Sequence, residues 1–318
     1  MGQVERGAWS PRANLVKQSL LAFALLLGTP LLAAEAPPRA RPPQFSAEDR
    51  AAFFDNAFDQ LVGPRPDYGS RSQQTATPQL AETGKGNKRW SDLIDEDTLE
   101  TEIKRQAKLL SEATDSSAGY RAAGYRQASD ALGLLSVLFA VTQEHDGQPR
   151  WRDTAAGLRD LLGESSFEAD AQSESAFKLA SRRSADLQDL VRGGRPDTPD
   201  PAAEVDWSEL ADRGGLMRRM AAAEEERLRG WVADRREFRR NAEDVAHEAR
   251  ILALLADAIV MPGAYDGDDS DYQAYARKLR EAATRLAAAA DDRNHEAAQR
   301  ELPALTRSCV ECHGDYRG

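Results

Sequence analysis

The two cysteines of the chain lie three residues apart near its C-terminus, and a histidine directly follows the second. The segment reads Cys309-Val310-Glu311-Cys312-His313, and the 318 residues contain no other cysteine. Two thiols about one helical turn apart can add to the two vinyl groups on one edge of a porphyrin, and the adjacent imidazole can then bind the iron. Cys-x-x-Cys-His is the attachment signature of c-type haem. The spacing predicts one covalently attached haem c, with His313 as an iron ligand.

Other uses of this cysteine pair fit the chain less well. A structural zinc ion takes four ligands, and the other histidines, His145, His247 and His295, are scattered along the sequence. A thioredoxin-like dithiol belongs in a βαβ context, which the sequence pattern does not indicate. A plain disulfide would close only a very small loop.

The elements around this motif have the pattern of amphipathic helices. Leu302, Leu305, Cys309, Cys312 and Tyr316 share one helical seam, which predicts that both thiols face a bundle interior. The second half of the chain divides into four such segments, at residues 208–230, 234–261, 270–289 and 295–316. Gly230 is only a weak break between the first two. Four helices with short connections bury their apolar stripes most simply as an antiparallel bundle.

The same arrangement recurs in the first half of the chain. Trp90-Ser91 and Trp207-Ser208 stand 117 residues apart (90 to 207), and each pair opens a similar hexapeptide. At that offset the apolar seam of residues 238–259, spaced alternately by four and three residues, falls on residues 121–142. The sequence therefore predicts an internal repeat and an all-α fold of two tandem antiparallel four-helix bundles.

The N-terminal region has the pattern of an export signal followed by a non-globular segment. Residues 1–34 combine a basic start, a short apolar run and small residues before a cleavage site, which is typical of a signal peptide. Residues 35–89 form a Pro-rich leader, one amphipathic helix and a polar linker that we expect to be disordered. A haemless bundle at 90–192, a linker at 193–204 and a haem-binding bundle at 205–318 complete the predicted organisation. We expect a periplasmic or otherwise exported protein.

Charge and hydropathy exclude several classes of protein. The chain has 42 Lys and Arg against 53 Asp and Glu, a net charge of −11. Nucleic-acid binding needs a basic surface, so we expect no nucleic-acid partner. Mean hydropathy is −0.61, and the N-terminal apolar run is shorter than the roughly 20 residues of a membrane span. We therefore expect no stable membrane span in the mature chain.

The C-terminal region resembles the cytochrome c-prime family, the class II c-type cytochromes. The resemblance rests on the haem motif with Tyr316 and Arg317 after it, on residues 272–300, and on the segment 213–220. It implies Cys309 and Cys312 as thioether anchors and His313 as the proximal ligand. Arg317 would then lie over the proximal face or a propionate.

The resemblance also places Met217 on the distal side of the haem, four residues after Arg213. Family members with methionine there are six-coordinate, low-spin electron carriers, and those with an apolar residue are five-coordinate and bind small gases. Met217 favours the methionine-ligated branch. Met220 as the ligand, or an open site with Met217 as core filler, are the alternatives.

The first half has lost the residues that would hold a haem. In the last segment the offset is 118, one residue more than in the others, so Cys309, Cys312 and His313 correspond to Val191, Gly194 and Arg195; at the offset of 117, Met217 corresponds to Glu100. Because class II cytochromes often form dimers, this haemless copy could replace a homodimer by pairing within the chain. We place His145 and His247 on helix surfaces or ends.

These features predict an exported monohaem c-type cytochrome that transfers single electrons between redox proteins of the cell envelope. Two other functions stay open: a five-coordinate protein that binds NO or CO, and a haem-bearing scaffold subunit of a redox complex. The residue pattern contains no catalytic triad, paired acid and base or phosphate loop, so we do not predict an enzyme.

Overall fold

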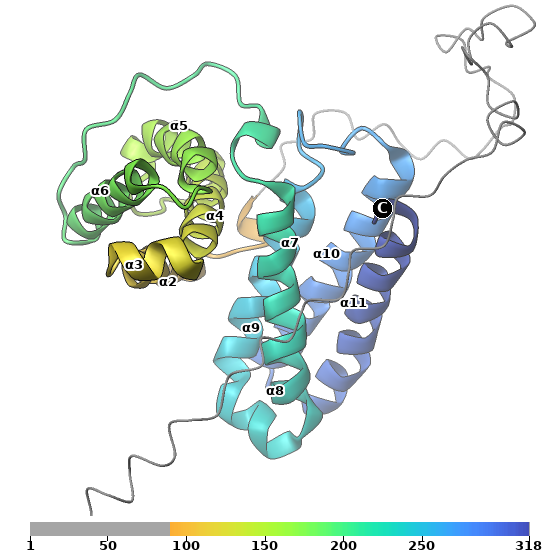
Figure 1. Ribbon diagram of the computed structural model, residues 1–318. Helices are drawn as coiled ribbons and strands as arrows, with labels where there is room; N and C mark the ends of the chain where they lie inside the picture. Colours follow the sequence, from red (N-terminus) through yellow and green to blue (C-terminus); the bar gives the residue numbers. More distant parts are fainter. Residues whose placement is uncertain (1–89, 318) are drawn as a thin grey trace, which may run out of the picture. The chain divides into compact units, whose positions relative to one another are not determined.

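A computed structural model of the chain describes residues 90–317 (Figure 1). The predicted signal peptide at 1–34 and the leader, helix and linker at 35–89 lie outside the described residues. The described part is all-helical and contains no β-strand. None of its helices combines the length and apolar character needed to cross a membrane.

The first four-helix bundle is built from α2, α4, α5 and α6, and each of these helices contacts its neighbours in a closed ring. A short helix, α3, and a π-helical segment, η3, lead directly into α4. The bounds are α2 Glu96–Ala113, α3 Ser117–Gly119, η3 Tyr120–Gly124, α4 Tyr125–Glu144, α5 Arg152–Ala169 and α6 Glu174–Val191.

The second bundle repeats this arrangement, and its helices run side by side in Figure 1. Its first helix is made of α7, a π-helical segment η5 and α8, which follow one another without a break, and α9, α10 and α11 complete the ring. The bounds are α7 Arg213–Ala221, η5 Ala222–Leu228, α8 Arg229–Ala233, α9 Arg235–Ala258, α10 Ser270–Asp291 and α11 His295–Tyr316. The fold is therefore the predicted all-α pair of tandem four-helix bundles.

The start of α7 differs from the predicted helix at residue 208. Trp207–Glu209 forms a short 3-10 helix, and α7 begins at Arg213 after Asp212, whose carboxylate accepts a hydrogen bond of 2.9 Å from the Gly215 backbone N–H. Gly214 and Gly215 thus lie in the first turn of α7. The backbone N–H groups of a first turn have no hydrogen-bond partner within the helix, so glycine disturbs the helix less there than in its middle. A Cβ at Gly215 would lie 2.7 Å from Asp130 Oδ1. A side chain at this position would therefore displace the Asp130 carboxylate, which pairs with Arg218.

The break after this first helix also lies later than predicted. The helix continues through Gly230 to Ala233, and Asp234 has an extended backbone with φ −125° and ψ 139°. Its carboxylate accepts bonds from the backbone N–H groups of Arg236 and Glu237 and so caps α9. A capping aspartate ends one helix and begins the next more effectively than an exposed glycine.

His145 lies at the end of α4, one of the predicted positions, although its side chain is buried. The prediction for His247 was wrong, because this residue lies within α9 and is also buried. His145 follows the last residue of α4, and its Nε2 lies 3.0 Å from the carbonyl oxygen of Ile94. His247 lies within α9, with Nε2 2.8 Å from the Glu102 carboxylate of α2. A polar partner on another element makes burial of each imidazole tolerable.

A buried charge network joins the first half of the chain to α7 and α9. Glu102 is fully buried and accepts hydrogen bonds from Arg219 of α7 at 3.0 Å and from Gln106 at 2.8 Å, in addition to its contact with His247. Arg219 also donates to the buried carboxylate of Glu248 at 2.7 Å. Because the partners satisfy one another, removal of one leaves an uncompensated buried charge.

Further contacts hold α7 against the first half. Arg218 donates two hydrogen bonds to the Asp130 carboxylate of α4, at 2.8 and 2.6 Å. The rings of Trp90 and Trp207, which open the two similar hexapeptides, are stacked with centroids 6.0 Å apart. The helix that carries Met217 is therefore positioned partly by the first half of the chain.

Glu102→Ala is expected to lower the free energy of unfolding by about 3–5 kcal/mol, because it strands Arg219 in a buried site. Chemical denaturation of both proteins measures the difference. Glu112→Ala is the matched control on the same helix: its partner Lys108 and Glu112 itself are both exposed, so the loss should stay below about 1 kcal/mol. Equal losses in the two variants would contradict a stabilising role for the network.

Acid should weaken the same network. Burial alone would raise the pKa of Glu102, but the hydrogen bond to His247 and the charge of Arg219 outweigh it and lower the pKa from 4.5 to about 2. A carboxylate with a lowered pKa contributes stability that is complete above pH 4.5 and is lost as the pH falls toward 2. In urea titrations over this range, the stability difference between wild type and Glu102→Gln should shrink as the pH falls. A difference independent of pH would contradict this assignment.

Candidate haem site

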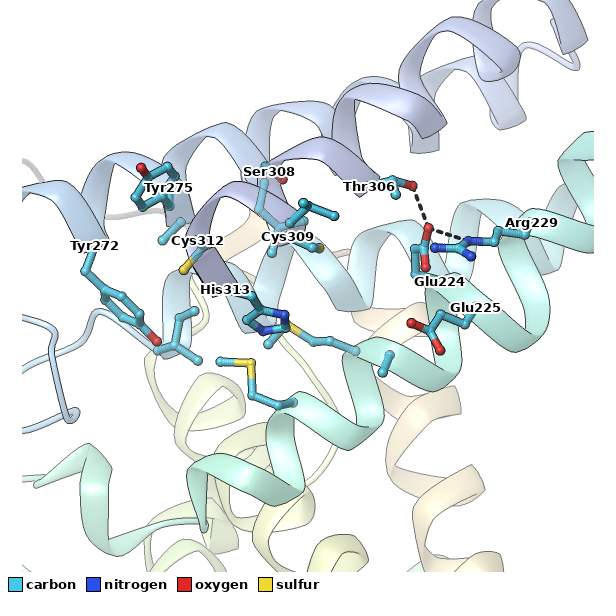
Figure 2. Close-up of a pocket in the computed structure, with 17 residues that line it drawn as sticks. Glu224, Glu225, Arg229, Tyr272, Tyr275, Thr306, Ser308, Cys309, Cys312 and His313 are labelled. Carbon is cyan, nitrogen blue, oxygen red and sulfur yellow. Dashed lines mark hydrogen bonds and ion pairs between the residues drawn. The ribbon is translucent and has the colours of Figure 1, made fainter. Parts of the chain in front are cut away.

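A cavity of about 130 Å³ opens between α7, η5, α10 and α11. Met217 and Met220 line it from α7, and the three residues of the haem motif, Cys309, Cys312 and His313, line it from α11. Figure 2 shows the His313 ring pointing into this cavity, toward the helix on the opposite wall. Residues almost one hundred positions apart are thus brought to one site.

Helix α11 presents both thiols as the predicted seam requires. Its start is capped by the side chain of Asn294, which accepts from the Ala297 backbone N–H at 3.1 Å. Leu305 is buried, and Cys309 and Cys312 are partly buried against the core. Both cysteines are free thiols. They therefore line the cavity and are available for thioether bonds.

The surroundings of the thiols keep them protonated. Burial, assisted by the nearby Glu224 carboxylate, raises the pKa of Cys309 to about 11. Burial also raises the pKa of Cys312, and the Asp315 carboxylate adds to the effect. Neutral thiols are the form that an apolar cavity accepts at lowest cost.

A second and more polar cavity, of about 430 Å³, adjoins the first. The two cavities share several lining residues: Met217, Ala221, Tyr272, Cys312 and His313. Three arginines also line the second cavity, namely Arg213, Arg218 and Arg317. The site as a whole thus has an apolar side and a cationic side.

The arginines differ in how far they are already paired. Arg213 forms an ion pair with Asp266 and stacks over the ring of Tyr265, 5.0 Å from its centroid. Arg218 is held by Asp130. Arg317 is exposed beyond the end of α11. Together they can balance the charge of carboxylate groups near the mouth of the site.

Glu224 and Thr306 form a polar corner of the first cavity that the sequence analysis missed. Glu224 is 6% exposed, accepts from Thr306 Oγ1 at 2.5 Å and pairs with Arg229 at 2.8 Å, as the dashed lines in Figure 2 show. The sequence does indicate that Glu224 faces the cavity, because it follows Met220 by four residues and so lies on the same helix face. The pairing with α11 was not visible, because it joins residues 82 positions apart.

Tyr272 contributes a hydroxyl to both cavities. Its side chain is 2% exposed, and its hydroxyl has no hydrogen-bond partner among residues 90–317. Burial raises its pKa to about 12, so the hydroxyl keeps its proton and can act as a donor.

These features fit a haem c. Two free thiols three residues apart stand at the edge of an apolar cavity, the imidazole of His313 enters it, and arginines flank the adjoining space. The unpartnered hydroxyl of Tyr272 is a further polar group that a bound cofactor would satisfy. Within residues 90–317, no group of three or more His, Cys, Asp or Glu side chains is placed to hold a metal ion by itself.

The structure brings all five sequence-predicted site residues together. Cys309, Cys312, His313 and Met217 line the first cavity, and Arg317 lines the second. Met220, the alternative ligand, also reaches the first cavity but is more deeply buried than Met217.

The corresponding positions of the first half have other partners. Glu100 pairs with Arg150 at 2.8 Å. Helix α6 ends at Val191, so Gly194 and Arg195 lie beyond it. Aromatic side chains instead fill this bundle: Tyr120 packs against Phe177, with centroids 5.6 Å apart, and Phe139 packs against Trp151 at 6.4 Å.

Comparison with known proteins supports this interpretation of the C-terminal region. Residues 265–317 match the model of a family described as Cytochrome C'. The match covers α10 and α11 and includes the whole haem motif, whereas α7 with Met217 lies outside it. Searches of curated proteins and of solved structures returned no match. The family match indicates a protein with covalently bound c-type haem, either an electron carrier or a gas-binding protein.

Proposed function

We propose that the protein is an exported monohaem cytochrome that carries single electrons between redox proteins of the cell envelope. The observation that supports this most directly is that Met217 and His313 stand on two different helices and line the same two cavities. A bound haem c would supply an iron centre that cycles between the ferric and ferrous states. The Met217 thioether and the His313 imidazole would hold the iron, and such a centre would transfer electrons rather than bind a substrate.

The chain's own residues would do the remaining work. Cys309 and Cys312 would anchor the cofactor to α11, and the same helix would orient His313 toward it. The apolar walls would limit the access of water to a bound haem, which would favour the less charged ferrous state and raise the reduction potential. Arg317, and the arginines paired on α7, balance negative charge at the mouth of the site. We propose that the protein is not an enzyme, in line with the family match to Cytochrome C'.

A redox titration followed by absorption spectroscopy tests electron transfer. We expect a reversible transition with a one-electron slope, and rapid oxidation and reduction without a change of spin state. A ferrous protein that is high-spin and binds CO or NO tightly would instead support the gas-binding function. Arg213, Tyr272 and the arginine-lined cavity are compatible with either, so the sixth ligand decides between them.

We propose further that the haemless bundle is an internal duplicate that serves as an intramolecular partner for the haem bundle. Two parallels support duplication: Asp95 and Asp212 both cap the first helix of their half, and the 3-10 helices before them begin with Trp90 and Trp207. The Glu102 network and the Arg218–Asp130 pair would then replace contacts that a second copy of the haem bundle could make.

Residues 205–318 expressed alone test this role. The segment should dimerise or aggregate and lose stability, because Arg219 and His247 lose their Glu102 partner. A soluble monomer with an intact haem spectrum would contradict intramolecular pairing. If deletion abolishes function in the cell while the spectrum stays unchanged, the bundle acts as a scaffold in a larger redox complex.

A further inference from the structure

The hydroxyl of Tyr272 is an unused hydrogen-bond donor inside the candidate haem site. The side chain lies in the first turn of α10 and is 2% exposed, and its hydroxyl has no partner among the described residues. Burying a hydroxyl without a hydrogen bond is unfavourable, because the group loses its bonds to water. A phenylalanine would fill the same space without this cost, so the position of the hydroxyl calls for a ligand that accepts its proton.

The geometry around Tyr272 indicates where that acceptor lies. Figure 2 shows its ring entering the site from α10, with the hydroxyl end directed toward the space beside His313 and Cys312. The residue lines the apolar cavity and also the cavity that carries the three arginines. Its ring is held in place by an edge-on contact with Tyr316, with centroids 5.0 Å apart. The hydroxyl therefore stands at the boundary between the apolar and the cationic sides of the site.

The arginines of the second cavity indicate which kind of group accepts the hydrogen bond from Tyr272. Three arginines around one cavity favour an anion, and carboxylates are the anionic groups of a haem. Arg213 and Arg218 are already engaged by Asp266 and Asp130. The Arg213 guanidinium also lies beside the Tyr272 hydroxyl, but an arginine can only donate, so the hydroxyl proton has no acceptor among the described residues. The Tyr272 hydroxyl is a neutral donor beside two arginines whose charge is partly neutralised. This combination suits a carboxylate that is half-buried in the protein.

We propose that the Tyr272 hydroxyl donates a hydrogen bond to a haem propionate and thereby orients that carboxylate and adjusts the electron density at the iron. This inference rests on the proposed haem site and adds a positioning residue to it. A hydrogen bond to a propionate withdraws negative charge from the macrocycle. Its removal should therefore stabilise the ferric state and lower the reduction potential.

The test compares Tyr272→Phe with wild type in the full-length holoprotein. Tyr275→Phe is the matched control: Tyr275 lies on the same helix and lines the first cavity, but its hydroxyl already donates to Asp315 at 2.6 Å. The resonance Raman spectrum reports the bending mode of the propionates, and a redox titration at fixed pH reports the potential. We expect Tyr272→Phe to lower both the frequency of that mode and the potential, and Tyr275→Phe to change neither.

Each contrary result has a separate meaning. If the wild-type protein carries no covalent haem, the proposed function fails before the variant is examined. If haem is present and Tyr272→Phe leaves the propionate mode unchanged, the inference about Tyr272 is wrong and the proposed function stands. A variant that alters CO or NO binding with an unchanged propionate mode likewise overturns it, because the hydroxyl would then face the iron ligand. Loss of fold is not expected, since the hydroxyl bonds to no described residue.

Discussion

Cys309→Ala combined with Cys312→Ala should abolish covalent attachment of haem. Both thiols line the cavity that His313 enters, and the chain has no other cysteine. Without them no thioether bond can form, whatever haem the cavity still binds non-covalently. Protein matured with a cytochrome c maturation system should therefore lose its haem on denaturing gels and on extraction with acidified acetone, whereas wild type keeps it. Each single variant should retain at most one thioether bond.

Val310→Ala is the control for this experiment. Val310 lies between the two cysteines but is 66% exposed, so its truncation should leave attachment and the haem spectrum unchanged. Full covalent attachment in the double variant would show that the haem is bound elsewhere in the chain. That outcome would overturn the assignment of α11 as the haem-binding helix.

Met217→Leu should convert the iron from a low-spin to a high-spin centre that binds CO in the ferrous state. Leucine keeps the volume of the side chain and its apolar character but removes the sulfur that would bind the iron. The reduction potential should fall as well, because a methionine ligand stabilises the ferrous state. Absorption spectra with and without CO, and a redox titration, measure both effects.

Met220→Leu is the matched comparison for Met217→Leu. Met220 lines the same cavity, yet it is buried in the core, and we assign it a packing role. Its substitution should leave the iron low-spin and silent to CO. The opposite pattern, in which only Met220→Leu opens the site, would make Met220 the ligand. No change in either variant would mean that neither sulfur binds the iron.

Much of the site could be predicted because its information is local. Two thiols and an imidazole within five residues indicate haem attachment from the sequence alone, before the fold is known. The apolar seam that includes Leu305 predicts which way the thiols face. The distal position needed more than spacing. Met217 was assigned through a resemblance, and the structure places it on the cavity because Asp212 starts the helix at Arg213.

The missed features depend on contacts between distant residues. Glu102 reads as a surface residue of an amphipathic helix, and only its contact with His247, 145 positions away, shows why both are buried. The pairing of Glu224 with Thr306 is similar. Tyr272 belongs to the apolar pattern of α10, but no periodicity indicates that its hydroxyl is unpaired. Sequence patterns indicate which face of a helix is buried, but not which polar groups meet there.

The absorption spectrum of the wild-type protein, matured with covalent haem and recorded ferric and ferrous with and without CO, tests the central claim most directly. We predict a low-spin spectrum with the weak far-red band of methionine–iron ligation and no response to CO. That result would place the protein among methionine-ligated electron carriers. A high-spin spectrum that shifts with CO would contradict the assignment of Met217 and make the protein a gas-binding cytochrome. Absence of covalent haem would contradict the whole account.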